Sequence, residues 1–251
     1  MKHKLKTETL RPMVIRITVA SMLVCVSAWS GVLAQLPAVP VPVENPITEA
    51  KRVLGKVLFW DEQLSSNNTV ACGTCHRPAA GGADPRVGRH TGTDKGTIDD
   101  VWGSPGVVLM NEAGEPLEHP IFGRDPQVTT RITPSNFGAL WANEVFWDGR
   151  ASSEFVDPLT GDVVIVSGGA LENQALAPLI NPTEMARPNR VWDELTEKLK
   201  GVRPLALARN LPADVSNAIE SNPDYPSLFQ ATFYDPEITP VRIAFAIATY
   251  E

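Results

Sequence analysis

The sequence predicts a mainly α-helical protein whose helices are joined by long loops. Apolar residues recur at helical spacing in several separate segments, each of a length usual for a globular helix. The chain contains 22 prolines, nearly all of them after residue 34, which indicates many turns and loops. Only residues 157–170 have the pattern of a small β-hairpin or an inserted loop.

The N-terminal segment has the layout of a secretory signal peptide. Its first residues are basic, an apolar run follows from Ile17 to about Val26, and small residues lead to Ala34. The run is too short to span a bilayer as an ordinary helix, and no later segment is long or apolar enough to do so. We therefore predict a signal peptide over residues 1–34, cleaved after Ala34, and a periplasmic protein without a membrane span. Lipid modification at Cys25 is the alternative, which Val24 disfavours because a small residue is expected there.

Cleavage after Ala34 makes the chain strongly acidic. It removes five of the 22 basic residues and one of the 29 acidic residues, which leaves 17 basic against 28 acidic side chains. Such an excess suits a basic protein partner and argues against a nucleic acid partner. The only cysteines then left are Cys72 and Cys75, so no disulfide framework is available for an oxidising compartment.

The elements are expected in the following order along the chain. Residues 35–45 form an extended, proline-rich leader, and Asn45-Pro46 has the pattern of an N-cap followed by a first-turn proline. Residues 65–135 lack a long periodic run, so we expect a large loop region that needs something to organise it. Further helices are expected at Gly138–Phe146, Val191–Lys200, Ala213–Glu220, Tyr225–Phe233 and from the cap Thr239-Pro240 to Glu251.

The segment Cys72-Gly-Thr-Cys75-His76 carries the chemistry of the chain. Three interpretations remain open: a redox dithiol, a zinc site completed by His90 and His119, or covalent attachment of haem. A dithiol usually opens a helix in a βαβ pattern, which is absent, and the histidine spacing matches no common zinc finger. The contiguous C-x-x-C-H pattern in an exported chain favours haem c, with two thioethers and an adjacent imidazole for the iron.

Ordered blocks along the chain carry a resemblance to one protein family. In order and content they resemble the bacterial di-haem cytochrome c peroxidases and their MauG-type relatives. The resemblance covers nearly the whole chain after residue 34. The blocks are Leu54–Ser65, Gly81–Asp84, Arg131–Pro134, Phe146–Ala151, Leu171–Gln174, Asn181–Met185, Ser221–Phe229 and Ile243–Glu251.

The resemblance implies a cytochrome c-like haem domain with long loops over residues 46–210. Residues 211–251 are then the incomplete start of a second cytochrome c-like domain. The family has a second C-x-x-C-H motif for another haem, and this chain has none after Cys75. We therefore expect one haem c on this chain, a second in a longer form of the protein, and a sequence that is a fragment or a truncated gene product.

The resemblance also implies the iron ligands. Cys72 and Cys75 hold the thioethers, His76 is the proximal ligand, and His90 is the distal ligand of the resting state. His119 has no counterpart in the family and is expected at the surface. Two methionines are alternative axial ligands, as in electron-carrying cytochromes c: Met110 and Met185.

Three further residues correspond to catalytic positions of the family. Gln174 and Glu184 match the polar pair over the peroxide pocket, where a carboxyl moves a proton between peroxide oxygens and an amide orients the peroxide. Trp147 matches a tryptophan that relays electrons between the haems, with simple core packing as the alternative. Ile132 stands where many relatives have a calcium-binding asparagine and offers no oxygen, which makes calcium doubtful.

The resemblance implies an exported peroxidase that reduces hydrogen peroxide to water. Its electrons are expected from a small donor cytochrome c or a cupredoxin, and a homodimer is one expected assembly. A MauG-like di-haem oxidase of protein side chains is the enzyme alternative. A mono-haem electron-transfer cytochrome c is the alternative from another class, and it requires a permanent methionine ligand.

Overall fold

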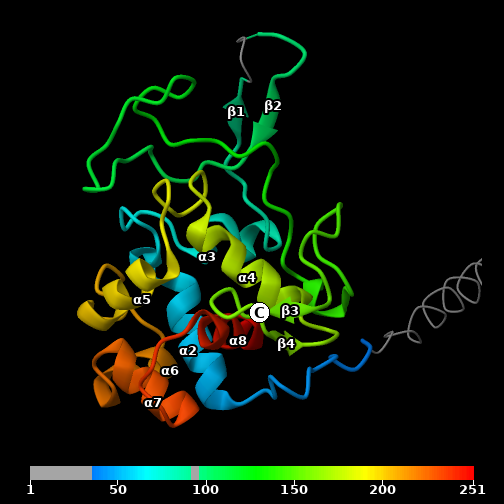
Figure 1. Ribbon diagram of the computed structural model, residues 1–251, viewed down its shortest axis with the longest axis vertical. Helices are drawn as coiled ribbons and strands as arrows, with labels where there is room; N and C mark the ends of the chain where they lie inside the picture. Colours follow the sequence, from blue (N-terminus) through cyan, green and yellow to red (C-terminus); the bar gives the residue numbers. More distant parts are fainter. Residues whose placement is uncertain (1–35, 92–95) are drawn as a thin grey trace, which may run out of the picture. The chain divides into compact units, whose positions relative to one another are not determined.

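Two helices from opposite ends of the sequence cross in the core of the computed structural model (Figure 1). Helix α2 (Glu49–Trp60) packs against helix α8 (Pro240–Tyr250). A Cβ atom at Gly55 would lie 1.9 Å from the carbonyl oxygen of Ala246, so the crossing requires glycine there. The Trp60 indole Nε1 donates a 2.9 Å hydrogen bond to the hydroxyl of Tyr250. The contact between α2 and α8 therefore joins the two ends of the described chain in one core.

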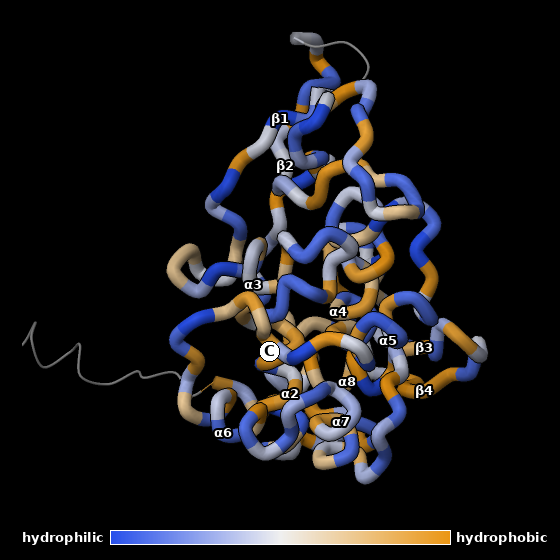
Figure 2. Tube along the Cα trace, turned by 90° about the vertical axis from the view of Figure 1, so that its left-hand side faces the viewer, coloured by the Kyte–Doolittle hydropathy of each residue, from blue (hydrophilic) through white to orange (hydrophobic). Residues whose placement is uncertain are grey.

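The structure describes residues 36–91 and 96–251, and the predicted signal peptide at residues 1–34 lies outside these residues. The segment from Val39 to Glu251 belongs to one compact unit. Figure 2 shows hydrophobic stretches along α2 and α8, whose inward side chains Leu54, Leu58 and Ile243 are at most 1% exposed. Burial of this kind supplies most of the free energy that stabilises the fold.

The remaining helices surround this pair, and the strands are short. Helix α4 packs on α8, while α6 and α7 pack on α2. The strands form two antiparallel pairs, β1 with β2 and β3 with β4. The elements are α3 (Cys72–Cys75), α4 (Ala170–Ile180), α5 (Trp192–Gly201), α6 (Ala213–Ser221), α7 (Tyr225–Phe233), β1 (Gly88–His90), β2 (Val101–Gly103), β3 (Phe155–Val156), β4 (Val163–Ile165) and the 3₁₀ turns Glu62–Leu64, Pro78–Ala80 and Ala139–Trp141. The mainly α-helical prediction is confirmed.

Three local predictions need correction. Helix α2 begins at Glu49 with Thr48 as its N-cap, whose side chain accepts from Lys51 N at 3.2 Å. Asn45 is no cap, because its amide donates to Glu172 Oε1 and accepts from Lys51 Nζ in a buried cluster. Residues 138–146 form only the 3₁₀ turn Ala139–Trp141. Helix α4 was not predicted.

Helix α4 has no clear polar face, which explains why its sequence pattern is weak. Six of its eleven residues are buried, including Glu172 and Gln174, so apolar and polar side chains alternate without a helical stripe. Pro178 lies inside the helix, and a proline usually marks a helix end. Tertiary packing between α8 and β3 stabilises α4 despite this weak pattern.

The segment assigned to a second domain shares its core with the first. Leu228 and Phe229 of α7 and Ile247 of α8 belong to the same hydrophobic cluster as Leu54 and Leu58 of α2. The boundary expected at residue 211 therefore coincides with no break in the core. The assignment of residues 211–251 to a second domain stays a prediction.

No helix within residues 36–91 or 96–251 combines the length and the apolar character that crossing a bilayer requires.

Candidate haem site

The C-x-x-C-H motif begins with a single helical turn anchored on α2. The Ala71 amide donates to Thr74 Oγ1 at 2.9 Å, and the His76 amide donates to the Cys72 carbonyl at 2.9 Å. Residues three apart in a helix lie on one side, which brings Cys72 and Cys75 together. The intervening Gly73 lies against the Trp60 ring, where a Cβ atom would be 2.4 Å from ring carbons. The packing therefore requires a glycine inside the motif.

His76 is held in one orientation by the loop that follows it. Its Nδ1 lies 3.1 Å from the Gly82 carbonyl oxygen, which can only accept a hydrogen bond. The proton is therefore on Nδ1, and Nε2 keeps a free lone pair for a metal. Burial also lowers the pKa of His76, which favours the neutral imidazole that ligates metals.

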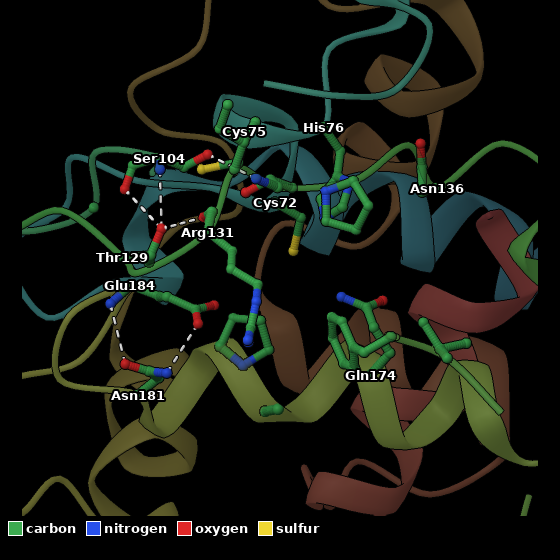
Figure 3. Close-up of a pocket in the computed structure, with 18 of the residues that line it drawn as sticks. Cys72, Cys75, His76, Ser104, Thr129, Arg131, Asn136, Gln174, Asn181 and Glu184 are labelled. Atoms are coloured by element: carbon green, nitrogen blue, oxygen red, sulfur yellow. Dashed lines mark hydrogen bonds between the residues drawn. The ribbon is translucent and has the colours of Figure 1, made fainter. Parts of the chain in front are cut away.

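A cavity of about 810 Å³ lies beside the motif. This volume is within the range of small-molecule and cofactor sites. Figure 3 shows Cys72, Cys75 and His76 on one side of this space and Gln174 of α4 on the other. Every site residue expected from the sequence lines the cavity: Cys72, Cys75, His76, His90, Trp147, Gln174 and Glu184.

Gln174 and Glu184 come to the cavity from α4 and from the turn after it. Gln174 is 8% exposed, and its amide points toward the side that carries His76 (Figure 3). Asn181 follows α4 and donates from Nδ2 to Glu184 Oε1 at 2.9 Å, while its Oδ1 accepts from the Thr183 amide. Burial raises the pKa of Glu184, and Arg150 offsets part of this effect. The carboxyl therefore takes up and releases a proton closer to neutral pH than an exposed glutamate does.

The two thiols are unlike those of a redox dithiol. Burial raises the pKa of Cys75 to about 11 and raises that of Cys72 further. Reactive dithiols instead have a lowered pKa that maintains the thiolate. In the described parts of the chain, no group of three or more His, Cys, Asp or Glu side chains is arranged to hold a metal ion.

The other predicted axial residues lie in different surroundings. His90, the last residue of β1, lines the cavity, and its ring meets Phe122 edge-on at 5.4 Å between centroids. The His119 ring lies tilted against the same Phe122 at 4.8 Å between centroids, and His119 does not line the cavity. Met185 lines the cavity and is buried, whereas Met110 is buried in the hydrophobic core away from it. Of the two methionines, only Met185 is therefore placed to approach a bound cofactor.

Trp147 lies at the rim of the cavity and is 74% exposed, so the alternative of simple core packing is wrong. The Arg131 guanidinium lies 4.3 Å from the centroid of its ring, a cation–π distance. Figure 3 shows the Arg131 side chain extending from the side that carries Cys72 toward helix α4. Arg131 belongs to the block Arg131–Pro134, but no sequence signal indicated that its side chain lies at the cavity beside Trp147.

Sequence reasoning also missed a third carboxyl, that of Glu251. It lines the cavity and accepts from Asn136 Nδ2 at 3.0 Å, while its Oε2 is buried without a hydrogen-bond partner. Burial raises its pKa to about 7, with a further rise from Glu172. Its sequence neighbours are apolar helix residues, so only the crossing of α8 over α2 brings it to this place.

These residues fit haem c. Cys72 and Cys75 offer two sulfur atoms within one helical turn, and His76 offers Nε2 toward the same cavity. The combination of two thiols and an adjacent neutral imidazole is the donor set of covalent haem.

Comparison with known proteins agrees with this donor set. The family model of the di-haem cytochrome c peroxidases matches residues 49–251. The methylamine utilization protein MauG of Methylophilus methylotrophus is 25% identical over 93% of this chain and 50% of its own length. A cytochrome-c peroxidase of Pseudomonas sp. (strain SCT) is 41% identical over 57% of this chain and 31% of its own length. The cytochrome c peroxidase Ccp of Escherichia coli (strain K12) is 30% identical over 65% of this chain and 24% of its own length.

The chain thus spans about half, or less, of the length of the curated relatives that it matches.

Proposed function

Because the chain belongs to the di-haem cytochrome c peroxidase family, we propose that it provides a haem c centre that reduces hydrogen peroxide to water in the periplasm. The electrons come from a small cytochrome c or a cupredoxin. One observation carries the proposal: the C-x-x-C-H motif and the pair Gln174 and Glu184 line opposite sides of one cavity.

Cys72 and Cys75 would attach the haem, and His76 would ligate its iron through Nε2. When bound, haem c supplies an iron centre that exchanges single electrons. The Gly82 carbonyl accepts from Nδ1 of His76 and thereby fixes the direction in which Nε2 points. Gly73 and Trp60 hold the motif on α2, so the attachment point is rigid.

Glu184 moves the proton that the cleavage of peroxide requires. Reduction of one hydrogen peroxide consumes two electrons and two protons and releases two waters. The Glu184 carboxylate takes the proton of the near peroxide oxygen and returns it to the far oxygen, which leaves as water. The raised pKa of Glu184 suits both halves of this transfer. The Gln174 amide donates toward the peroxide and stabilises the charge that develops on it.

Trp147 lies on the side from which electrons arrive. Its ring is exposed at the cavity rim and is therefore accessible to a redox partner or to a further haem-bearing part of a longer protein. The guanidinium of Arg131 over the ring face favours the neutral indole over an oxidised, positively charged one.

A MauG-like oxidase of protein side chains is the second candidate function. The observation that favours it is the MauG relative whose matched region covers 93% of this chain. In that case Trp147 at the rim passes electrons inward, from a protein substrate to the same centre. A mono-haem electron carrier is less well supported, because a buried Gln174 and a raised carboxyl pKa at Glu184 have no use in a carrier.

The proposed function is tested with two forms of the haem-loaded protein. Residues 35–251 alone are expected to bind haem and to show little turnover with reduced cytochrome c and peroxide. A form extended through a second haem motif is expected to turn over, because two electrons are then stored close to the peroxide. Steady-state oxidation of reduced cytochrome c measures both. Robust activity of the short form that does not depend on Glu184 would contradict the proposal.

We expect His90→Gly to change the spin state of the ferric haem. If His90 is the distal ligand, its removal leaves the iron five-coordinate or bound to water, which converts a low-spin absorption spectrum to a high-spin one. Electronic absorption and electron paramagnetic resonance spectra of the purified variant measure this change. His119→Gly serves as the control, because His119 does not line the cavity. An unchanged low-spin spectrum in His90→Gly would assign the distal position to another residue.

A further inference from the structure

Glu184 belongs to a turn, residues 182–185, that follows α4. Hydrogen bonds from the loop region of residues 65–135 fix this turn, in addition to its connection to α4. Three backbone carbonyls of the turn accept hydrogen bonds from distant segments. Pro182 O accepts from Gln127 Nε2 at 2.8 Å, and Thr183 O accepts from the Val107 amide at 3.2 Å. Met185 O accepts from the Ser66 amide at 2.8 Å. The position of the turn therefore depends on residues that lie far from it in sequence.

Gln127 links the segment around Val107 to the turn that carries Glu184. It is 5% exposed, and its Nε2 donates both to Pro182 O at 2.8 Å and to Val107 O at 3.3 Å. Its backbone amide donates to Val107 O at 3.0 Å, and its carbonyl accepts from the Gly106 amide at 2.9 Å. A buried amide in such a network is costly to replace, because its partners lose their donors and have no water instead.

Gly106 lies where the two segments approach most closely. A Cβ atom at this residue would lie 1.9 Å from Thr183 O, 2.8 Å from Glu184 O and 2.9 Å from Glu184 Cα. These atoms belong to the backbone and cannot rotate away as a flexible side chain can. Any larger residue at position 106 must therefore displace the peptide that carries Glu184.

We propose that Gln127 and Gly106 are positioning residues that hold the Glu184 carboxyl at its place in the cavity. The inference rests on the proposed role of Glu184 in proton transfer. Asn181 orients the carboxyl within the turn, while Gln127 and Gly106 set the position of the turn itself. Misplacement of a reacting group by about 1 Å can cost about 10²-fold in rate, so small shifts of this turn are measurable.

The test compares Gln127→Met with Glu184→Ala and with the double variant, all in a His90→Gly background that opens the iron. Methionine has nearly the shape of glutamine and donates no hydrogen bond. Stopped-flow absorbance measures the reaction of the ferric haem with hydrogen peroxide. We expect Gln127→Met to slow the reaction about tenfold and to have no further effect when Glu184 is alanine. It is also expected to shift the pH midpoint of the rate that Glu184 controls.

Cyanide binding provides a readout that involves no turnover. Hydrogen cyanide must lose a proton when it binds as cyanide, so a base at Glu184 accelerates binding. The association rate is expected to fall in Glu184→Ala and in Gln127→Met. Gln63→Met is the matched control: Gln63 is equally buried and donates to the Arg203 carbonyl at 2.7 Å, away from the cavity. This control is expected to keep both rates.

Two further variants keep the test decisive. Gln127→Glu retains the shape and replaces the amide donor by a carboxyl, and Gly106→Ala displaces the turn while the Gln127 side chain stays unchanged; either replaces Gln127→Met if that variant does not fold. The inference is wrong if Glu184→Ala slows both reactions while the Gln127 and Gly106 variants match the parent. It is also wrong if Gln127→Met slows the reaction equally with Glu184 present or absent. If Glu184→Ala itself changes neither rate, the proposed role of Glu184 fails instead.

Discussion

Replacing both Cys72 and Cys75 with alanine is expected to abolish covalent haem attachment. The parent protein, expressed in a periplasm with haem-ligation machinery, should retain its haem through denaturing electrophoresis and gain the mass of one haem. The double variant should show neither, because thioether bonds need both sulfur atoms and its chain has no other cysteine after residue 34. Haem-stained gels and intact mass spectrometry of the two proteins measure the effect.

The single variants are the controls for this result. Cys72→Ala and Cys75→Ala each keep one sulfur atom in the helical turn, and each should retain haem through one thioether with an altered absorption spectrum. His76 is unchanged in all three variants, so loss of haem reports attachment and not ligation. A parent protein that is colourless and contains stoichiometric zinc would contradict the haem assignment.

Replacing Glu184 with alanine is expected to slow the peroxide step by about 10²-fold or more, the usual scale for loss of a positioned acid–base group. The measurement is stopped-flow absorbance on the haem-loaded protein extended through a second haem motif. Asn181 donates to Glu184 Oε1 and loses this partner in the variant, but the backbone hydrogen bonds from the Glu184 and Met185 amides to the Asn181 carbonyl remain. The fold of the site is therefore expected to survive.

The pH dependence of the same step has a defined direction. Burial raises the pKa of Glu184, so its carboxyl stays protonated to a higher pH than an exposed glutamate and cannot yet accept a proton. The rate should therefore rise with pH through a midpoint above the ordinary carboxyl range. Glu184→Gln should lose this rise, because the amide does not titrate in that range.

Glu172→Gln is the matched control for both Glu184 experiments. Glu172 is buried on α4, where its carboxylate accepts from the Asn45 amide, and burial also raises its pKa. It does not line the cavity, so its replacement should keep both the rate and the pH profile. A Glu184→Ala variant with the parent's rate would show that another group moves the proton.

The predictability of the fold varied with the sequence pattern of each helix. Helices α5, α6, α7 and α8 present an apolar stripe to the core, and their predicted bounds agree with the structure within about two residues. Helix α4 is buried on several sides and contains Pro178, so periodicity could not indicate it. Asn45 has the composition of a cap, yet its side chain bonds to Glu172, a partner that sequence cannot supply.

The sequence by itself determined the residues of the attachment motif, because two thioethers and one imidazole need a short, contiguous spacing that a single helical turn provides. It also brought Gln174 and Glu184 into consideration through the ordered blocks. Only the tertiary structure placed them opposite His76 in one cavity, since that placement depends on α8 crossing α2 and α4 packing on α8.

The same holds for the residues that no pattern indicated. Glu251, Gln127 and Gly106 reach the site through contacts with Asn136, Pro182 O and Thr183 O, which lie 55 or more residues away in sequence. A motif of neighbouring residues indicates which chemical groups are present. The position of a carboxyl relative to an iron ligand depends instead on the packing of distant backbone segments. The sequence therefore determined what the site is made of, and the tertiary structure decided which groups act on one another.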